Sequence, residues 1–131
     1  MIAIDTNILL RFLEQDDDAA QTSAARELVR SEGMVFINPI VLVELAWVLR
    51  STFELDRQSI HARLKRLVVA PEFKLPFPEA TERAVAQYGN GPADFADCLM
   101  GELNLALGCD TTMTFDKDAS KTRAFTSLKL R

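Results

Sequence analysis

Short apolar runs alternate along this chain with longer segments of helical periodicity. Runs in which nearly every residue is apolar are typical of strands buried on both faces. The five predicted strands are 1–4, 34–37, 73–75, 109–115 and 124–128. Strands that alternate with helices predict an α/β fold: one domain over residues 1–131, with a central, mostly parallel sheet of four to five strands and helices on both faces.

The first predicted strand ends at a carboxylate, Asp5, after which Thr6 or Asn7 can cap the following helix. The fourth strand repeats this arrangement, because the small hydroxyl of Thr114 comes shortly before Asp116. In open α/β sheets, ligands bind outside the carboxyl ends of the strands. Asp5 and Asp116 are therefore candidate site residues, although a lone aspartate at such a position is more often a turn or cap residue.

Glu44 lies in a predicted helix, 40–50, that is apolar on nearly every side. Its neighbours one turn away include Val41 and Trp47, so its carboxylate would lose hydration without a compensating partner. Two interpretations stay open. One is an ion pair with an arginine such as Arg50, and the other is a role at a metal or active site.

The helix predicted over 93–107 carries two aspartates on its polar face. Asp94 and Asp97 are neighbours near the helix N-terminus, where the helix dipole favours negative charge. Gly101, one turn further on, costs a helix roughly 1 kcal/mol relative to alanine. Room for a ligand beside the carboxylates would explain this glycine. Capping by Asp94 and exposure of Asp97 explain each acid separately but not the set.

A further acidic run, residues 14–18, precedes the helix predicted over 19–32. Aspartates at this position cap the helix and complement its dipole, and Gln21 stands three residues after Asp18. We assign the run no catalytic role.

Charge and reactive side chains narrow the chemistry further. The net charge of −4 argues against a protein that coats nucleic acid by gross charge, but not against an enzyme that holds a phosphodiester through metal ions. Cys98 and Cys109 fit no metal-binding spacing and are expected to be reduced thiols. The one histidine, His61, lies among basic residues. Mechanisms that need a histidine base are therefore poorly supported.

The sequence lacks a basic leader at its N-terminus, and no apolar run approaches the roughly 20 residues of a membrane helix. We therefore expect a cytoplasmic protein without a membrane partner.

The candidate acids together suggest a metal site. At about 4 Å separation and an effective dielectric near 20, like charges repel by roughly 4 kcal/mol per pair, and a divalent cation would remove this conflict. An all-oxygen donor set favours Mg²⁺ or Mn²⁺ over zinc, and such a site supports phosphodiester hydrolysis without a histidine. The expected ligands, direct or through water, are Asp5, Glu44, Asp97 and Asp116. Asp94 would orient a second metal or the attacking water.

Two other classes of function compete with this one. A phosphatase or phosphotransferase of the haloacid-dehalogenase-like kind would use Asp5 as nucleophile. Such enzymes carry a second acid two residues later, where this chain has Asn7. A non-catalytic binding domain would use Asp5 and Asp116 as caps and Glu44 in a buried salt bridge.

Four segments in order resemble the PIN domain and, within it, the VapC-type toxin ribonucleases. They read "IAIDTNILLRF", "VLVELAWVL", "ADFADCLMGELN" and "TTMTFDKDA". The resemblance covers essentially the whole chain, including the spacing between the acids. It implies a metal-dependent endoribonuclease, the toxin of a type II toxin–antitoxin pair, with a central parallel sheet.

The resemblance also implies roles for individual residues. It puts the acidic quartet on Asp5, Glu44, Asp97 and Asp116. Asp94 corresponds to an additional acid found in some members, and Asn7 and Thr114 match polar residues that flank the quartet. The implied partners are an RNA substrate, a small VapB-like antitoxin whose C-terminal segment covers the active site, and a second copy in a homodimer.

Overall fold

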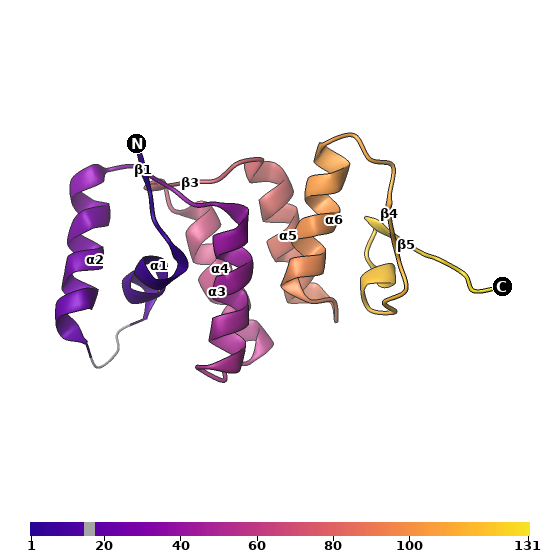
Figure 1. Ribbon diagram of the computed structural model, residues 1–131, viewed down its shortest axis with the longest axis horizontal. Coiled ribbons are helices and arrows are strands. Elements are labelled where there is room, and N and C mark those ends of the chain that lie inside the picture. The colour runs from indigo at the N-terminus through magenta and orange to yellow at the C-terminus, as the bar shows by residue number, and fades with distance from the viewer. Residues whose placement is uncertain (15–17) are drawn as a thin grey trace.

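The computed structural model describes residues 1–14 and 18–131, and the statements below concern these residues. The strands are β1 (Ile2–Ala3), β2 (Val35–Phe36), β3 (Phe73–Lys74), β4 (Thr112–Thr114) and β5 (Phe125–Ser127). The helices are α1 (Thr6–Leu13), α2 (Ala19–Glu32), α3 (Pro39–Ser51), α4 (Arg57–Val69), α5 (Pro78–Asn90) and α6 (Phe95–Ala106), with a short 3₁₀-helix, η1 (Ala119–Lys121). Every strand pair is parallel, which confirms the predicted α/β class (Figure 1).

The prediction of one continuous central sheet is wrong for the described chain. The strands form two sheets, one with the order β1-β2-β3 and one that contains β4 and β5. Figure 1 shows α5 and α6 between them, so that β4 and β5 lie at the opposite end of the molecule from β1. Periodicity detects a strand but not its neighbour, because the neighbour depends on contacts between distant parts of the chain.

Local capping follows the sequence closely in the N-terminal half. Asp18 accepts the backbone N–H of Gln21 at 3.0 Å and caps α2, as predicted, while residues 15–17 of the same acidic run lie outside the described residues. Asn38 likewise accepts the N–H of Ile40 at 2.9 Å and caps α3. These side chains satisfy N–H groups that a helix start otherwise leaves unpaired.

Each sheet has its own hydrophobic core. The larger core packs the helices against β1–β3 and includes the fully buried Leu9, Leu45 and Leu64. The smaller one joins Phe125 and its neighbours to Leu105 on α6. None of the described helices combines the length and apolar character needed to cross a membrane.

Candidate active site

Asp5 and Glu44 come together on one open surface pocket. Asp5 Oδ1 accepts the backbone N–H of Ile8 at 3.0 Å, so Asp5 itself caps α1, in place of the predicted Thr6 or Asn7. This hydrogen bond holds the carboxylate at the end of β1. Glu44 projects from α3 into the same pocket, which Asn7 also lines.

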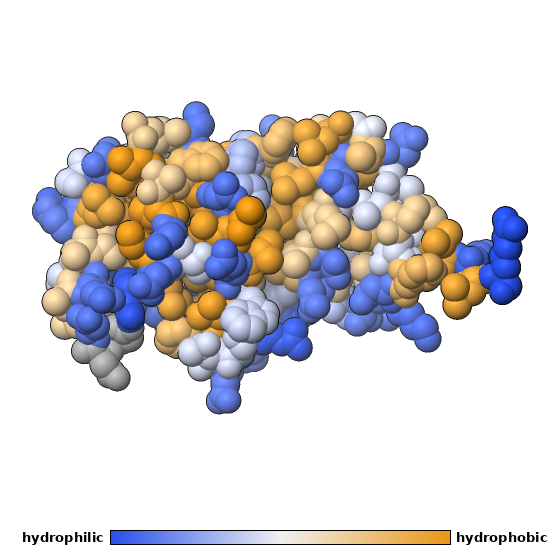
Figure 2. Space-filling view, viewed as in Figure 1, coloured by the Kyte–Doolittle hydropathy of each residue, from blue (hydrophilic) through white to orange (hydrophobic). Residues whose placement is uncertain are grey.

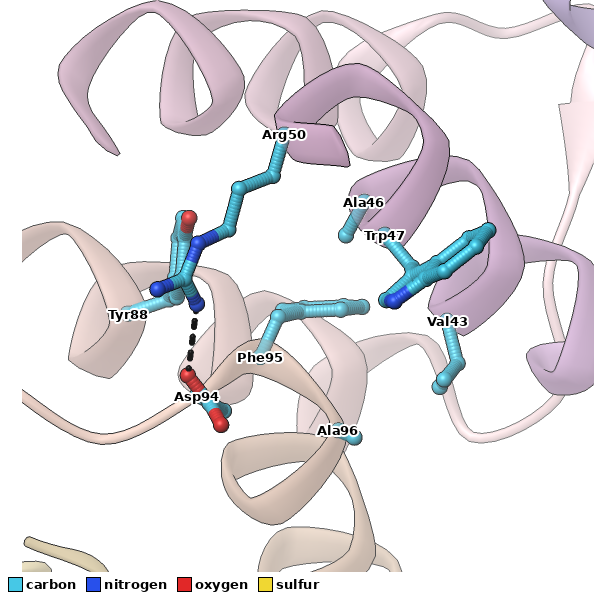
Figure 3. Close-up of a pocket in the computed structure, with 8 residues that line it drawn as sticks. All are labelled: Val43, Ala46, Trp47, Arg50, Tyr88, Asp94, Phe95 and Ala96. Atoms are coloured by element: carbon cyan, nitrogen blue, oxygen red, sulfur yellow. Dashed lines mark hydrogen bonds and ion pairs between the residues drawn. The ribbon is translucent and has the colours of Figure 1, made fainter. Parts of the chain in front are cut away.

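Glu44 is exposed rather than buried, so the expected loss of hydration does not occur. The alternative ion pair with Arg50 does not form either. Arg50 Nη1 instead contacts Asp94 Oδ1 at 3.3 Å, across from α3 to the start of α6 (Figure 3). Glu44 therefore stays available to a ligand in the pocket that it shares with Asp5.

Asp94 stands at the edge of a small apolar pocket between α3 and α6. Figure 3 shows Arg50 reaching toward Asp94, with Tyr88 beside the guanidinium and Trp47 turned toward Phe95. Both charged side chains are largely exposed, and an exposed ion pair of this kind contributes about 0.2–1 kcal/mol at most. A phosphate or a metal ion can therefore compete for either partner at small cost.

Asp97 lies where its negative charge is poorly compensated. Burial raises the pKa of the Asp97 carboxyl, and the nearby carboxylates of Asp116 and Asp94 raise it further. Asp116 is held firmly beside it: its backbone N–H donates to Thr114 Oγ1 at 2.9 Å, and its Oδ1 accepts the N–H of Ala119 at 2.8 Å. These contacts fix Asp116 at the end of β4.

The sequence-predicted acids thus form two groups. Asp5 and Glu44 share one pocket, and Asp97 interacts with Asp116 and Asp94. Within residues 1–14 and 18–131, no three or more His, Cys, Asp or Glu side chains are arranged to hold a metal ion. The expected meeting of the quartet in one crevice is absent from the single described chain, because β1 and β4 belong to different sheets.

Sequence reasoning missed the most buried acid of this region, Glu102. Its side chain has no exposed surface and accepts hydrogen bonds from Arg83, Gln87 and Arg123. Burial alone would raise its pKa, but the hydrogen bonds from Arg123, Arg83 and Gln87 outweigh burial and lower the pKa of Glu102 overall. The sequence feature that points to a buried Glu102 is its position between Gly101 and Leu103, in an otherwise apolar stretch of the helix.

The interpretation of Gly101 as room for a ligand is wrong. A Cβ at this position would stand 2.5 Å from Phe125 Cε2 and 2.7 Å from Ala124 Cβ. The glycine therefore makes room for β5 and the residue before it, which pack directly on α6.

The chain also matches a known protein family. The sequence profile described as "PIN domain" matches residues 2–124. The chain belongs to the PIN domain family. A "VapC ribonuclease" from Aquifex aeolicus (strain VF5) is similar to it, with 22% identity over 123 residues that cover 92% of this chain and 91% of that protein.

The donor chemistry of this PIN domain fits a hard divalent cation. The candidate side chains offer only oxygen donors, which Mg²⁺ and Mn²⁺ prefer. Burial raises the pKa of Asp97 and the carboxylates of Asp116 and Asp94 raise it further, a repulsion that a bound cation would relieve. In the described part of the chain, fewer acids come together than the quartet requires.

Proposed function

We propose that this PIN domain is a metal-dependent endoribonuclease that hydrolyses RNA phosphodiesters, and that it is the toxin of a type II toxin–antitoxin pair. The observation that carries the proposal is the match of residues 2–124 to the PIN domain, with Asp97 close to Asp116 and Asp94; burial and these two neighbours also raise the pKa of Asp97. Perturbed carboxyl groups of this kind cluster at functional sites. The similarity to a VapC ribonuclease supports RNA as the substrate.

The proposed quartet, Asp5, Glu44, Asp97 and Asp116, would hold Mg²⁺ or Mn²⁺. Such an ion supplies the Lewis acidity that activates water and stabilises charge on the phosphoryl oxygens. The protein's own contribution is orientation. The hydrogen bond from Ile8 fixes Asp5, and those to Thr114 and from Ala119 fix Asp116.

Two polar residues and a further acid complete the proposed site. Asn7 lines the pocket of Asp5 and Glu44, and Thr114 supports Asp116 from β4. We assign Asp94 the orientation of the attacking water or of a second metal. Arg50, which contacts Asp94 in the free protein, is a cation at the edge of the site that an RNA phosphate can engage.

The RNA-cleavage experiment uses antitoxin-free protein and a pool of total tRNA and rRNA, with Mn²⁺, with Mg²⁺ and with EDTA. Asp97→Asn is the test variant, and Asp110→Asn, which alters an exposed aspartate outside both groups, is its matched control. We expect discrete products that require metal, persist in Asp110→Asn and disappear in Asp97→Asn. Equal cleavage by both variants, or none by folded wild-type protein, would contradict the proposal.

A small VapB-like antitoxin is the proposed partner of the toxin. Expression of the chain alone should then arrest growth in a host, while Asp97→Asn should be harmless. Co-expression of the small protein encoded beside it should restore growth and yield a complex that purifies as one species. Harmless expression of a demonstrably active ribonuclease would contradict the toxin role.

A further inference from the structure

The pocket between α3 and α6 is lined by none of the four proposed metal ligands. It holds about 140 Å³, and its lining includes Trp47 and Arg50 of α3, Tyr88 of α5, and Asp94 and Phe95 at the start of α6 (Figure 3). Pockets for drug-sized ligands hold about 300 Å³ or more. This aromatic pocket therefore has room for one ring system rather than for a whole nucleotide.

Trp47 presents a large aromatic face to solvent at the side of the pocket. It is 67% exposed, whereas Tyr88 and Phe95 are buried and pack edge to face with their ring centroids 5.8 Å apart. In the described part of the chain, no aromatic ring pairs with the indole of Trp47 in the same way. Tryptophan is on average a highly buried residue. An exposed indole beside a pocket therefore indicates a platform for a ligand.

Arg50 places a positive charge at the mouth of the pocket. It lies one helical turn after Trp47, so both side chains project from the same side of α3. Its contact with Asp94 at 3.3 Å is an exposed ion pair, which costs little to give up. A guanidinium binds phosphate through charge-assisted hydrogen bonds. A flat ring with an attached anion thus matches both the pocket and its mouth.

The surface around the pocket does not form one broad apolar face. Figure 2 shows apolar residues over the part of the molecule that carries α3, interrupted by hydrophilic ones. A permanent contact with another protein typically needs a larger, continuous apolar patch, within about 800 Å² buried on each partner. A pocket for a single ring with a cation at its mouth favours a nucleotide over a protein.

We propose that this aromatic pocket binds one unstacked base of single-stranded RNA, with the base stacked on Trp47 and the phosphate of the same nucleotide bound to Arg50. Proteins that bind single strands combine aromatic platforms with basic side chains in this way, and stacking tolerates any base because every base has a π-face. The choice of RNA as the ligand rests on the proposed function. Because a duplex keeps its bases stacked on one another, the pocket selects single-stranded or looped RNA.

A base in this pocket would hold the RNA strand next to the candidate acids. Asp94 lines the pocket and also lies close enough to Asp97 for its charge to act on that carboxyl group. When Arg50 turns to the phosphate, Asp94 loses its ion pair and becomes available to the metal site. The pocket thus joins substrate binding to the group of Asp97 and Asp116.

Fluorescence of Trp47 tests the stacking directly, because Trp47 is the one tryptophan of the chain. The probe is a short single-stranded oligoadenylate, titrated in EDTA so that metal-dependent cleavage does not take place. An abasic oligonucleotide of the same length, with the same phosphates but no bases, is the matched ligand. Oligoadenylate should quench the tryptophan emission and the abasic strand should not. An equal response to both ligands, or no response to either, would overturn the proposal.

Affinity for labelled oligoadenylate, measured by fluorescence anisotropy in EDTA, tests the same contact by substitution. Trp47→Ala should weaken binding by about 5- to 150-fold, as expected for one stacked base, and Trp47→Phe should retain part of the affinity. Ile40→Ala is the matched control, since Ile40 is an equally exposed apolar residue of α3, at 66%, outside the pocket. Equal affinities of Trp47→Ala and Ile40→Ala would overturn the proposal. So would unchanged RNA affinity together with an altered oligomer mass of Trp47→Ala, which would assign the pocket to a protein contact.

The salt dependence of the same affinity tests the role of Arg50. Each phosphate neutralised on a single strand contributes about −0.7 to the slope of log K against log salt concentration. Arg50→Gln should therefore reduce the magnitude of the slope by about 0.7. Arg30→Gln, which removes an exposed arginine paired with Glu27 on α2, should leave it unchanged. Equal slopes for the two variants would overturn the assignment of the phosphate to Arg50.

These measurements separate the pocket from the proposed function. Base-dependent quenching in a protein that never cleaves RNA would overturn the proposed function and leave the base-binding pocket in place. An active ribonuclease whose Trp47→Ala variant binds RNA as tightly as wild type would overturn the pocket and leave the proposed function in place.

Discussion

Asp97 and Glu102 lie on the same helix, α6, and their surroundings shift their pKa values in opposite directions. Partial burial raises the pKa of Asp97, and two neighbouring carboxylates raise it further. Glu102 is fully buried but accepts hydrogen bonds from two arginines and a glutamine, and its pKa is lowered. Glu102 thus stabilises the fold as an anion, whereas the surroundings of Asp97 disfavour its ionised form.

Asp97→Asn should stabilise the metal-free protein. Because the folded-state pKa of Asp97 is raised, its ionisation disfavours the folded state, and this penalty appears as the pH rises above the ordinary value of 3.8. The gain in unfolding free energy should stay below about 1 kcal/mol, since the group is only partly buried. Thermal melts in EDTA measure this gain at pH 7, where Asp97 is expected to be ionised in the unfolded chain, and below pH 4, where the gain should disappear. Asp110→Asn is the control. A melting temperature of Asp97→Asn below that of wild type at pH 7 would contradict the raised pKa of Asp97.

The two cysteines should differ in reactivity. Burial raises the pKa of the Cys98 thiol to about 11, so its reactive thiolate is scarce at pH 8, whereas Cys109 is exposed. Iodoacetamide should therefore add one group to the native protein, on Cys109, and two groups after denaturation. Peptide mass spectrometry locates the adducts. Rapid native labelling of Cys98 would show that α6 is less protected than the structure indicates.

At the scale of elements, the contact between α6 and β5 holds the C-terminal sheet in place. The close approach of Phe125 to Gly101 and the ion pairs of Glu102 act at neighbouring positions of the same helix. The sequence predicted both the helix and the strand but not this contact. A glycine in a helix does not indicate what lies against it, and the three hydrogen-bond donors of Glu102 lie 15 to 21 residues away in the sequence.

Gly101→Ala should destabilise the protein although alanine is the better helix former. The added Cβ meets Phe125 and Ala124 well inside contact distance. Overpacking costs about 1–3 kcal/mol, and contacts this short put the cost above the roughly 1 kcal/mol gained in helix propensity. Urea unfolding measures the net loss. Gly91→Ala, just past the end of α5, is the control for a glycine with room for a side chain, because among the described residues its Cβ would meet only the carbonyl oxygen of Gln87, at 3.4 Å. Equal stability of the two variants would refute the packing account.

Glu102→Gln should lower the unfolding free energy by about 2–3 kcal/mol. This loss is near the lower end for a broken buried ion pair, because Arg83 and Arg123 are about half exposed. The folded-state pKa of Glu102 is lowered, so its contribution is present above the ordinary value of 4.5 and is lost as the pH falls through the folded-state value. Urea unfolding measures the difference in unfolding free energy between wild type and Glu102→Gln. This difference should therefore shrink below pH 4.5. A difference that is constant with pH would mean that packing, rather than charge, accounts for it.

For the whole molecule, the sequence predicted the α/β class, the order of the elements and the family, because apolar periodicity and strand-end acids are local features. It did not predict the division into two sheets. Which strand lies beside β1 depends on where α6 holds β4, and thus on the contacts of Glu102 and Gly101. The predicted acids lie at the expected ends of β1 and β4, but the chain alone leaves them in two groups.

The central claim is that these carboxylates bind a divalent metal for RNA hydrolysis, and calorimetric titration with Mn²⁺ tests it most directly. Wild-type protein and Asp110→Asn should give the same binding isotherm, and Asp97→Asn should lose binding. Removal of Mn²⁺ with EDTA should return the wild-type melting temperature to its metal-free value. Identical isotherms for wild type and Asp97→Asn, or no binding by folded wild-type protein, would contradict the account.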